Sequence, residues 1–169
     1  VNIKLIEMMI DEGYEFDCMM WYDDMGYKLN QFFSLDMYRE LLKPFHKRAI
    51  DWAKSKGMKT YLHSCGDIRP LIPELIGIGL DSLNPIEVKA GMDPLFIKKT
   101  FGDKLVLHGG INAVNWDKLD IITKEIENVL PVLKKNGGRI FASDHSIPDA
   151  VSFDNFKSII NLVKKLGAY

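Results

Sequence analysis

Apolar residues follow two patterns along the chain: short uninterrupted runs, and longer segments with an apolar residue every three or four positions. The short runs predict buried strands, at residues 16–22, 58–64, 80–87, 104–110 and 139–145. The longer segments predict helices, at residues 1–13, 34–57, 68–79, 93–102, 117–138 and 152–167. Strands and helices therefore alternate through most of the chain.

Residues with known preferences for helix ends support these boundaries. Ser34, Asp93 and Ser152 stand where a side-chain oxygen can accept the first free N–H groups of a helix. Prolines open the predicted helix at 68–79, whereas Pro44 and Pro131 lie within longer helices, where the missing N–H should bend the chain at Pro44 and distort it at Pro131. The helix that begins at Ser34 is expected to bury one apolar face, formed by Leu35, Tyr38, Leu42, Phe45, Ala49 and Trp52.

A strand followed by a helix, repeated roughly five times, is typical of an α/β fold with parallel strands and right-handed crossovers. Both an open sheet and a closed (β/α)8 barrel fit this pattern. A complete barrel needs about 250 residues, whereas this chain has 169 and starts at Val1 inside a helical pattern. We expect a single domain over residues 1–169, and a fragment, the later part of a barrel, if the fold is closed.

Composition limits the kinds of partner. The chain has 22 basic and 23 acidic residues and a net charge of -1, so bulk charge attracts neither nucleic acid nor an anionic membrane. Cys18 and Cys65 lie in predicted core strands, and no secretory signal or membrane-spanning apolar run accompanies them. This cysteine usage favours a cytoplasmic protein with free thiols over one with a disulfide.

Polar residues suited to chemistry follow the predicted strands. In chain order they are Asp23 and Asp24, His63 and Cys65, Asn84 and Glu87, His108 and Asn112, and Asp144 and His145. The carboxyl ends of parallel strands meet at one end of the sheet, and α/β proteins place their sites there. We therefore expect these side chains to form one site.

His63 and Cys65 are chemically the most demanding pair. They are two residues apart, so on an extended strand their side chains point the same way. A thiolate and a neutral imidazole aimed at one point suit Zn²⁺. The alternative is a buried cysteine beside a hydrogen-bonded histidine, because the second ligand pair that makes zinc motifs specific is absent.

Three acidic residues and another histidine are candidates for catalysis or for completing a metal site. Asp23 and Asp24 could act as acid and base or orient a ligand, although one of them is expected to cap a turn. Glu87 could be a third metal ligand or a solvated loop charge. His145 could be a ligand, a general acid or base, or a plain loop residue.

Asn84, His108 and Asn112 are candidates for substrate contacts. Gly109 and Gly110 follow His108 and would let the backbone approach a ligand closely, although a tight turn explains them equally well. The chain contains no glycine-rich motif for a dinucleotide or nucleoside triphosphate and no G-x-S-x-G elbow of a serine hydrolase. These classes of enzyme are not indicated.

Four segments cover most of the chain in a fixed order, namely WYDDMGYKLNQFFS, LHSCGDIRPLIPELIGIGLDSLNPIE, AGMDPLFIKKTFGDKLVLHGGIN and GGRIFASDHSIPDAVSFDNF. Together they resemble the uroporphyrinogen decarboxylase superfamily. It includes the decarboxylase and zinc-dependent methyltransferases that move a methyl group between a methylated corrinoid and a thiol. The resemblance implies a TIM barrel of the uroporphyrinogen decarboxylase type, of which this chain holds about the last five βα units.

The resemblance also implies ligands. In the methyltransferase branch a His-x-Cys pair, matched by His63 and Cys65, binds zinc with a later cysteine, where this chain offers His145. In the decarboxylase branch a histidine near the last strand, again matched by His145, acts without such a pair. We favour a methyltransferase whose zinc is held by His63, Cys65 and either Glu87 or His145, with a corrinoid as methyl carrier.

Two other functions stay open. One is a uroporphyrinogen decarboxylase, which would act on a tetrapyrrole without a metal. The other is a domain that binds a tetrapyrrole or corrinoid without turnover. Under the favoured reading the partners would be a small thiol and a corrinoid protein, and a homodimer is compatible with the sequence.

Overall fold

The computed structural model describes residues 3–168. Its main sheet has five parallel strands in the spatial order β1 (Cys18–Tyr22), β4 (Lys59–His63), β5 (Ser82–Ile86), β6 (Val106–Gly109) and β7 (Arg139–Ile140). The predicted α/β architecture is confirmed. Within the described residues the sheet does not close, since β1 and β7 are its edges. A partial barrel has this form.

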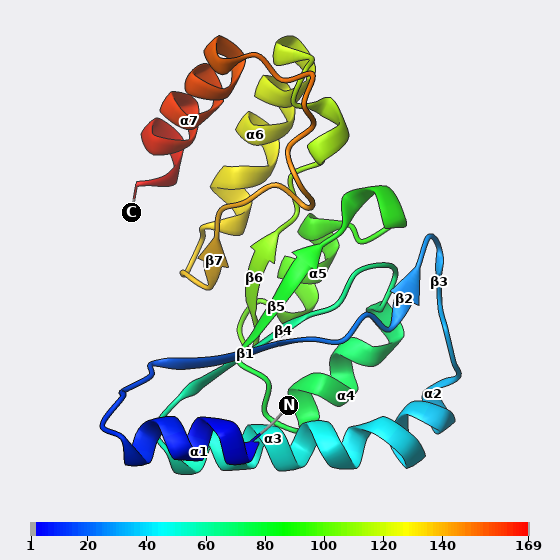
Figure 1. The fold of residues 1–169 in the computed structure, drawn as a ribbon. Coiled ribbons are helices and arrows are strands. Elements are labelled where there is room, and N and C mark those ends of the chain that lie inside the picture. The colour runs from blue at the N-terminus through cyan, green and yellow to red at the C-terminus, as the bar shows by residue number, and fades with distance from the viewer. Residues whose placement is uncertain (1–2, 169) are drawn as a thin grey trace.

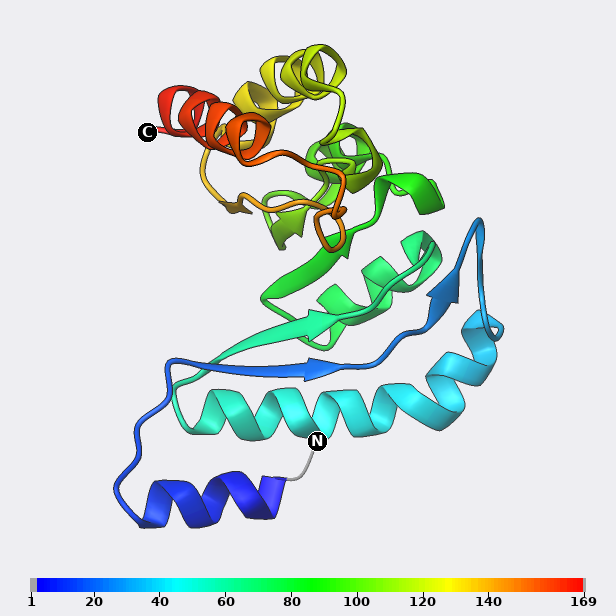
Figure 2. The same cartoon turned by 45° about the horizontal axis from the view of Figure 1, so that its top comes forward.

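Helix α1 precedes the first strand, and helices then follow the strands of the main sheet in the order that the sequence predicts. They are α1 (Ile3–Asp11), α2 (Leu35–Met37), α3 (Lys43–Ser55), α4 (Ile72–Gly77), α5 (Pro94–Phe101), α6 (Leu119–Leu133) and α7 (Phe153–Gly167). Short turns of helix are η1 (Tyr38–Leu42), η2 (Arg69–Leu71), η3 (Val88–Ala90) and η4 (Ala113–Asn115). Figure 1 shows the elements, and Figure 2 shows the strands succeeding one another from β1, beside α3, to β7, near α6 and α7.

All three predicted helix caps are confirmed. Ser34 Oγ accepts a hydrogen bond from Met37 N, Asp93 accepts from two backbone N–H groups of α5, and Ser152 Oγ accepts from Asn155 N. α6 continues past Pro131 to Leu133, so this proline does not end the helix.

The helix that starts at Ser34 changes its winding just before Pro44. η1 is a π-helical turn, in which Lys43 N donates to Tyr38 O. Pro44 has no N–H with which to continue the ordinary i to i−4 bonding, which accounts for the bend at this point. Phe45, expected on the buried face, is 67% exposed, and His46 is buried instead, because the wide turn rotates the residues after it.

Helices pack against one face of the sheet, and the other face is open at β1. Side chains buried against the helices include Met19, Trp21, Leu62, Leu83 and Leu107. The side chains that alternate with these on β1, namely Cys18, Met20 and Tyr22, are exposed. Parallel sheets normally have both faces covered, and this open face is the one that lines the interior of a closed barrel. The expectation that Cys18 lies in the core is therefore wrong.

A hairpin between β1 and α2 was not predicted. It consists of β2 (Gly26–Tyr27) and β3 (Asn30–Gln31) and lies against the loop after β4, where Asp67 N donates to Tyr27 O at 3.0 Å. Its strands are too short to show an apolar pattern.

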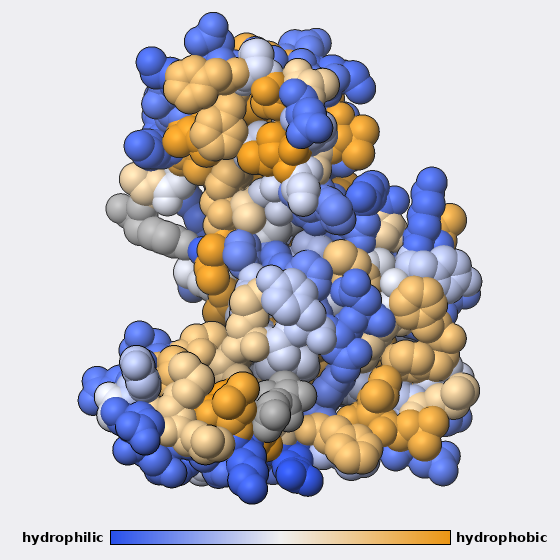
Figure 3. Space-filling view, in the orientation of Figure 1, coloured by the Kyte–Doolittle hydropathy of each residue, from blue (hydrophilic) through white to orange (hydrophobic). Residues whose placement is uncertain are grey.

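Apolar side chains also reach the surface away from the sheet. Figure 3 shows them gathered over α1 and the α2–α3 segment, where the exposed residues include Leu5, Met8, Met37, Leu41 and Phe45. No helix among residues 3–168 combines the length and the apolar composition that crossing a membrane requires.

Candidate functional site

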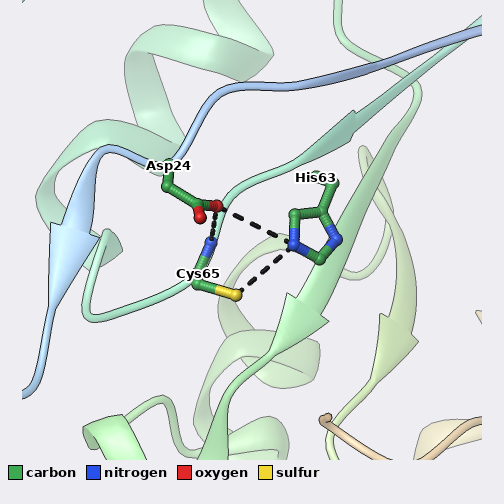
Figure 4. Close-up of side chains that lie close together, drawn as sticks. All are labelled: Asp24, His63 and Cys65. Atoms are coloured by element: carbon green, nitrogen blue, oxygen red, sulfur yellow. Dashed lines mark hydrogen bonds and ion pairs between the residues drawn. The ribbon is translucent and has the colours of Figure 1, made fainter. Parts of the chain in front are cut away.

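Asp24, His63 and Cys65 converge at the carboxyl ends of β1 and β4 (Figure 4). One ligand atom from each lies within 4.8 Å of the others, and this is the one such group of three among residues 3–168. Cys65 Sγ is 3.3 Å from His63 Nε2, which in turn is 3.8 Å from Asp24 Oδ1. Three of the side chains predicted to meet therefore do so.

Asn84 sets the orientation of the His63 ring. Its Oδ1 lies 2.6 Å from His63 Nδ1, while its Nδ2 donates to the carbonyl oxygen of His108 at 3.3 Å. The second bond fixes which end of the amide faces the histidine, so Nδ1 carries the ring proton. The lone pair of Nε2 then faces Cys65 and Asp24, as a metal ligand requires.

Backbone hydrogen bonds join the loop after β1 to the loop after β4. Asp24 Oδ1 accepts from Cys65 N at 2.8 Å, Met25 N donates to Ser64 Oγ at 3.0 Å, and Asp23 N donates to the carbonyl of His63 at 2.9 Å. Neighbouring parallel strands place these loops side by side. The site is thus built on two adjacent strand ends.

Gly66 allows the two loops to approach. Its φ is +87°, and a Cβ at this position would lie 2.1 Å from the carbonyl carbon of Gly26. Gly66 N also donates to Glu87 Oε2 at 2.6 Å. Only glycine fits this backbone conformation and this contact, so Gly66 helps to hold Cys65 in place.

The surroundings of Cys65 keep its thiol protonated. Burial, together with the negative charges of Asp24 and Glu87, raises the pKa of the Cys65 thiol to about 11. A bound divalent cation would act in the opposite direction, because it favours the thiolate. Metal binding at this position would therefore be coupled to loss of a proton.

Glu87 and His145 do not join the three ligand atoms. Glu87 is 7% exposed and its carboxylate is engaged by Gly66 N and, at 3.5 Å, by Lys89 Nζ. His145 is exposed, and its carbonyl accepts a hydrogen bond from Ser143 Oγ. The acid that lies beside His63 and Cys65 is Asp24.

Asp144 is fully buried and tethers the loops after β5 and β6. Its Oδ2 accepts from Val88 N at 2.8 Å and its Oδ1 accepts from Ala113 N at 2.7 Å. Asp23 also bonds away from the three ligand atoms, since its Oδ2 lies 2.8 Å from Nε2 of His46 on α3. Sequence reasoning missed His46, because neither a motif nor a strand end marks it.

The remaining candidates have distinct surroundings. His108 Nδ1 forms a hydrogen bond with Tyr61 OH, and burial, with the positive charge of Arg139, lowers the pKa of His108. Asn112 caps η4 by accepting from Val114 N at 3.2 Å. A cavity of about 790 Å³ at the amino ends of the strands is lined by Tyr61 and His108 among others, but by none of the three ligand residues. It is a separate feature from the candidate metal site.

Comparisons with known proteins place these features in a family. The family model described as "Uroporphyrinogen decarboxylase (URO-D)" matches residues 1–166. A uroporphyrinogen decarboxylase from Helicobacter pylori (strain P12) is 33% identical over 97 residues, which are 55% of this chain and 28% of the relative.

A methyltransferase from Methanosarcina mazei has the same fold. Its solved structure matches with a TM-score of 0.64 at 22% identity, over 95% of this chain and 44% of the methyltransferase. The chain therefore spans less than half the length of either protein. With nearly the whole chain matched by one family model, it belongs to the uroporphyrinogen decarboxylase family.

Proposed function

We propose that the chain carries the metal-binding part of a zinc-dependent methyltransferase, which moves a methyl group between a methylated corrinoid and a thiol. The observation that supports this best is the convergence of a carboxylate, an imidazole and a thiol within 4.8 Å. A decarboxylase that works without a metal has no need of such a group.

The side chains fit zinc by their chemistry. Sulfur, imidazole nitrogen and carboxylate oxygen are the ligand types that zinc takes in proteins, and three protein ligands leave a fourth position for a substrate. Asn84 plays the part of the outer partner that orients a ligating histidine. Zinc held here would lower the pKa of a substrate thiol and keep the thiolate available to an electrophilic methyl group.

Each residue of the site would have its own role in binding the metal or the substrate. Cys65 would lose its proton on binding the metal, His63 would offer the lone pair of Nε2, and Asp24 would supply negative charge. The ring of Tyr22 packs on His63 with centroids 4.6 Å apart and is 72% exposed, so it offers a flat apolar wall to a substrate. His108, whose carbonyl accepts from Asn84 Nδ2 beside His63, is the proposed polar contact for that substrate.

Metal analysis tests the proposal. The purified protein should hold about one zinc ion per chain, and His63→Asn or Cys65→Ser should remove most of it. Cys18→Ser is the matched control, because Cys18 begins β1 at the opposite end of the strand from Asp24. Absence of zinc from the wild type, with no effect of either ligand substitution, would contradict the proposal.

A uroporphyrinogen decarboxylase is the second candidate. The identity of 33% to a protein of that name supports it, as does the lack of a third cysteine in the chain. Incubation with uroporphyrinogen would then convert acetate side chains to methyl groups and release carbon dioxide. A spectral shift on adding a tetrapyrrole or corrinoid, without product, would instead indicate a binding domain that does not catalyse.

A further inference from the structure

A buried chain of hydrogen bonds links α3 to the end of β1. Tyr38 OH lies 3.2 Å from His46 Nδ1, and His46 Nε2 lies 2.8 Å from Asp23 Oδ2. Tyr38 is fully buried and His46 is 5% exposed, whereas the Asp23 side chain is partly open to solvent. A neutral imidazole protonated on Nε2 satisfies both neighbours, since it accepts from the tyrosine and donates to the carboxylate.

The π-helical turn η1 makes this series of hydrogen bonds possible. On a regular α-helix, residues eight positions apart are rotated by about 80° from one another. The wide turn holds one extra residue, which brings Tyr38 and His46 to within about 20° of the same face. The ring of Trp21 on β1 also packs beside His46, with centroids 5.9 Å apart. The bend before Pro44 thus serves to aim two polar side chains at the strand end.

Asp23 connects the Tyr38–His46–Asp23 hydrogen bonds to the candidate metal site. It directly precedes Asp24, whose side chain is 55% exposed, accepts a hydrogen bond from Cys65 N and lies near His63. The position of the Asp24 carboxylate therefore depends on the backbone that carries it. That backbone is held on the strand side by Asp23 N to the carbonyl of His63, and on the helix side by Asp23 Oδ2 to His46.

We propose that His46 is a positioning residue for the metal site: it ties Asp23 to α3 and so holds the Asp24 carboxylate beside His63 and Cys65. This inference rests on the proposed metal site. His46 itself does not touch the metal or a substrate. It acts on the position of Asp24, which is the neighbour in sequence of its hydrogen-bond partner Asp23.

Cobalt(II) titration of the zinc-free protein tests this inference, because cobalt absorbs visible light when bound by nitrogen and sulfur ligands. His46→Leu removes both hydrogen bonds while keeping an apolar side chain, and should weaken cobalt binding about tenfold or more. His46→Gln can accept and donate at similar positions and should restore most of the affinity. Tyr38→Phe, which removes one hydroxyl and preserves volume, should weaken binding less than His46→Leu.

Trp52→Phe is the matched control. Trp52 also lies on α3, and Trp52→Phe also removes a side-chain hydrogen bond, from Nε1 to Glu7 Oε1 at 2.9 Å, but Glu7 is on α1 and not at a strand end. If Trp52→Phe loses as much unfolding free energy in urea as His46→Leu, it should still leave cobalt affinity unchanged. This result would distinguish a positioning role from general destabilisation. If His46→Leu does not fold, the test rests on Tyr38→Phe, which should bind cobalt more weakly than the wild type.

The possible failures are distinct. If wild-type protein shows no cobalt spectrum, the proposed metal site is wrong. If the wild type binds cobalt, and His46→Leu and Tyr38→Phe bind it with the same affinity and spectrum, the site stands and the positioning role is overturned. The same holds if Trp52→Phe weakens cobalt binding as much as His46→Leu does.

Discussion

At Cys65, the protein environment and a bound metal act on the thiol in opposite directions. Burial and the nearby carboxylates of Asp24, Glu87 and Asp144 raise the pKa of the thiol to about 11 from an ordinary 9.0. Because the folded state favours the protonated form, this thiol contributes stability below pH 9, and the contribution is lost as pH rises through about 11. A partly buried cysteine that stays protonated is unreactive, and a bound metal would be needed to form its thiolate near neutral pH.

The reactivity of the metal-free thiol should follow this shift. In a Cys18→Ser background, alkylation of Cys65 by iodoacetamide at pH 8 should be roughly a hundredfold slower than in the unfolded chain, since thiolate is the reacting form. Asp24→Asn should speed the reaction, because it removes a negative charge. A rate profile with its midpoint near pH 9 in the folded protein would contradict the prediction.

Gly66 and Gly57 have similar backbone conformations but differ in the room available for a Cβ atom. Both have positive φ, +87° and +78°, but a Cβ at Gly57 would meet nothing within 4 Å, whereas at Gly66 it would overlap Gly26. Gly57→Ala should cost about 1 kcal/mol of unfolding free energy, and Gly66→Ala about 3 kcal/mol or more. Urea unfolding measures both. Equal losses would mean that the close approach of the two loops does not matter.

At the scale of elements, buried carboxylates hold the loops in place. Asp144→Ala would leave the buried N–H of Ala113 and the partly buried N–H of Val88 without acceptors, and we expect a loss of about 3 kcal/mol. Asp144→Asn keeps one acceptor oxygen and should lose less. As a control, Asp93→Ala removes an exposed helix cap and should cost about 1 kcal/mol. Urea unfolding that shows Asp144→Ala to be no worse than Asp93→Ala would refute this role.

The elements were predicted with uneven success for identifiable reasons. Ser34, Asp93 and Ser152 cap as expected, because capping depends on local backbone N–H groups. The last strand was expected over 139–145 but spans only Arg139–Ile140, where β6 supplies its single neighbour. Strand length depends on a partner, and the local sequence does not contain that information.

For the molecule as a whole, the sheet has one covered face and one open face. Met19 and Met20 are neighbours on β1, and only Met19 is buried. Met19→Thr should therefore cost about 2–4 kcal/mol of unfolding free energy, and Met20→Thr less than about 0.5 kcal/mol. Urea unfolding at several protein concentrations checks this. A large, concentration-dependent loss in Met20→Thr would show that another chain covers the open face in solution.

The sequence alone determined the order of strands and helices, the family, and the end of the sheet at which His63 and Cys65 lie. The order of the elements follows from short-range periodicity, and the end of the sheet from the rule that parallel strands share a carboxyl end. The family follows from the four segments that resemble it. The tertiary structure decided which acid joins them. Asp24, Glu87 and Asp144 all follow strands, and only packing shows that Asp24 faces the histidine and cysteine while the other two accept buried backbone N–H groups. It also brought His46 to Asp23, because contacts between a helix and a distant strand end depend on three-dimensional geometry, which spacing along the chain does not encode.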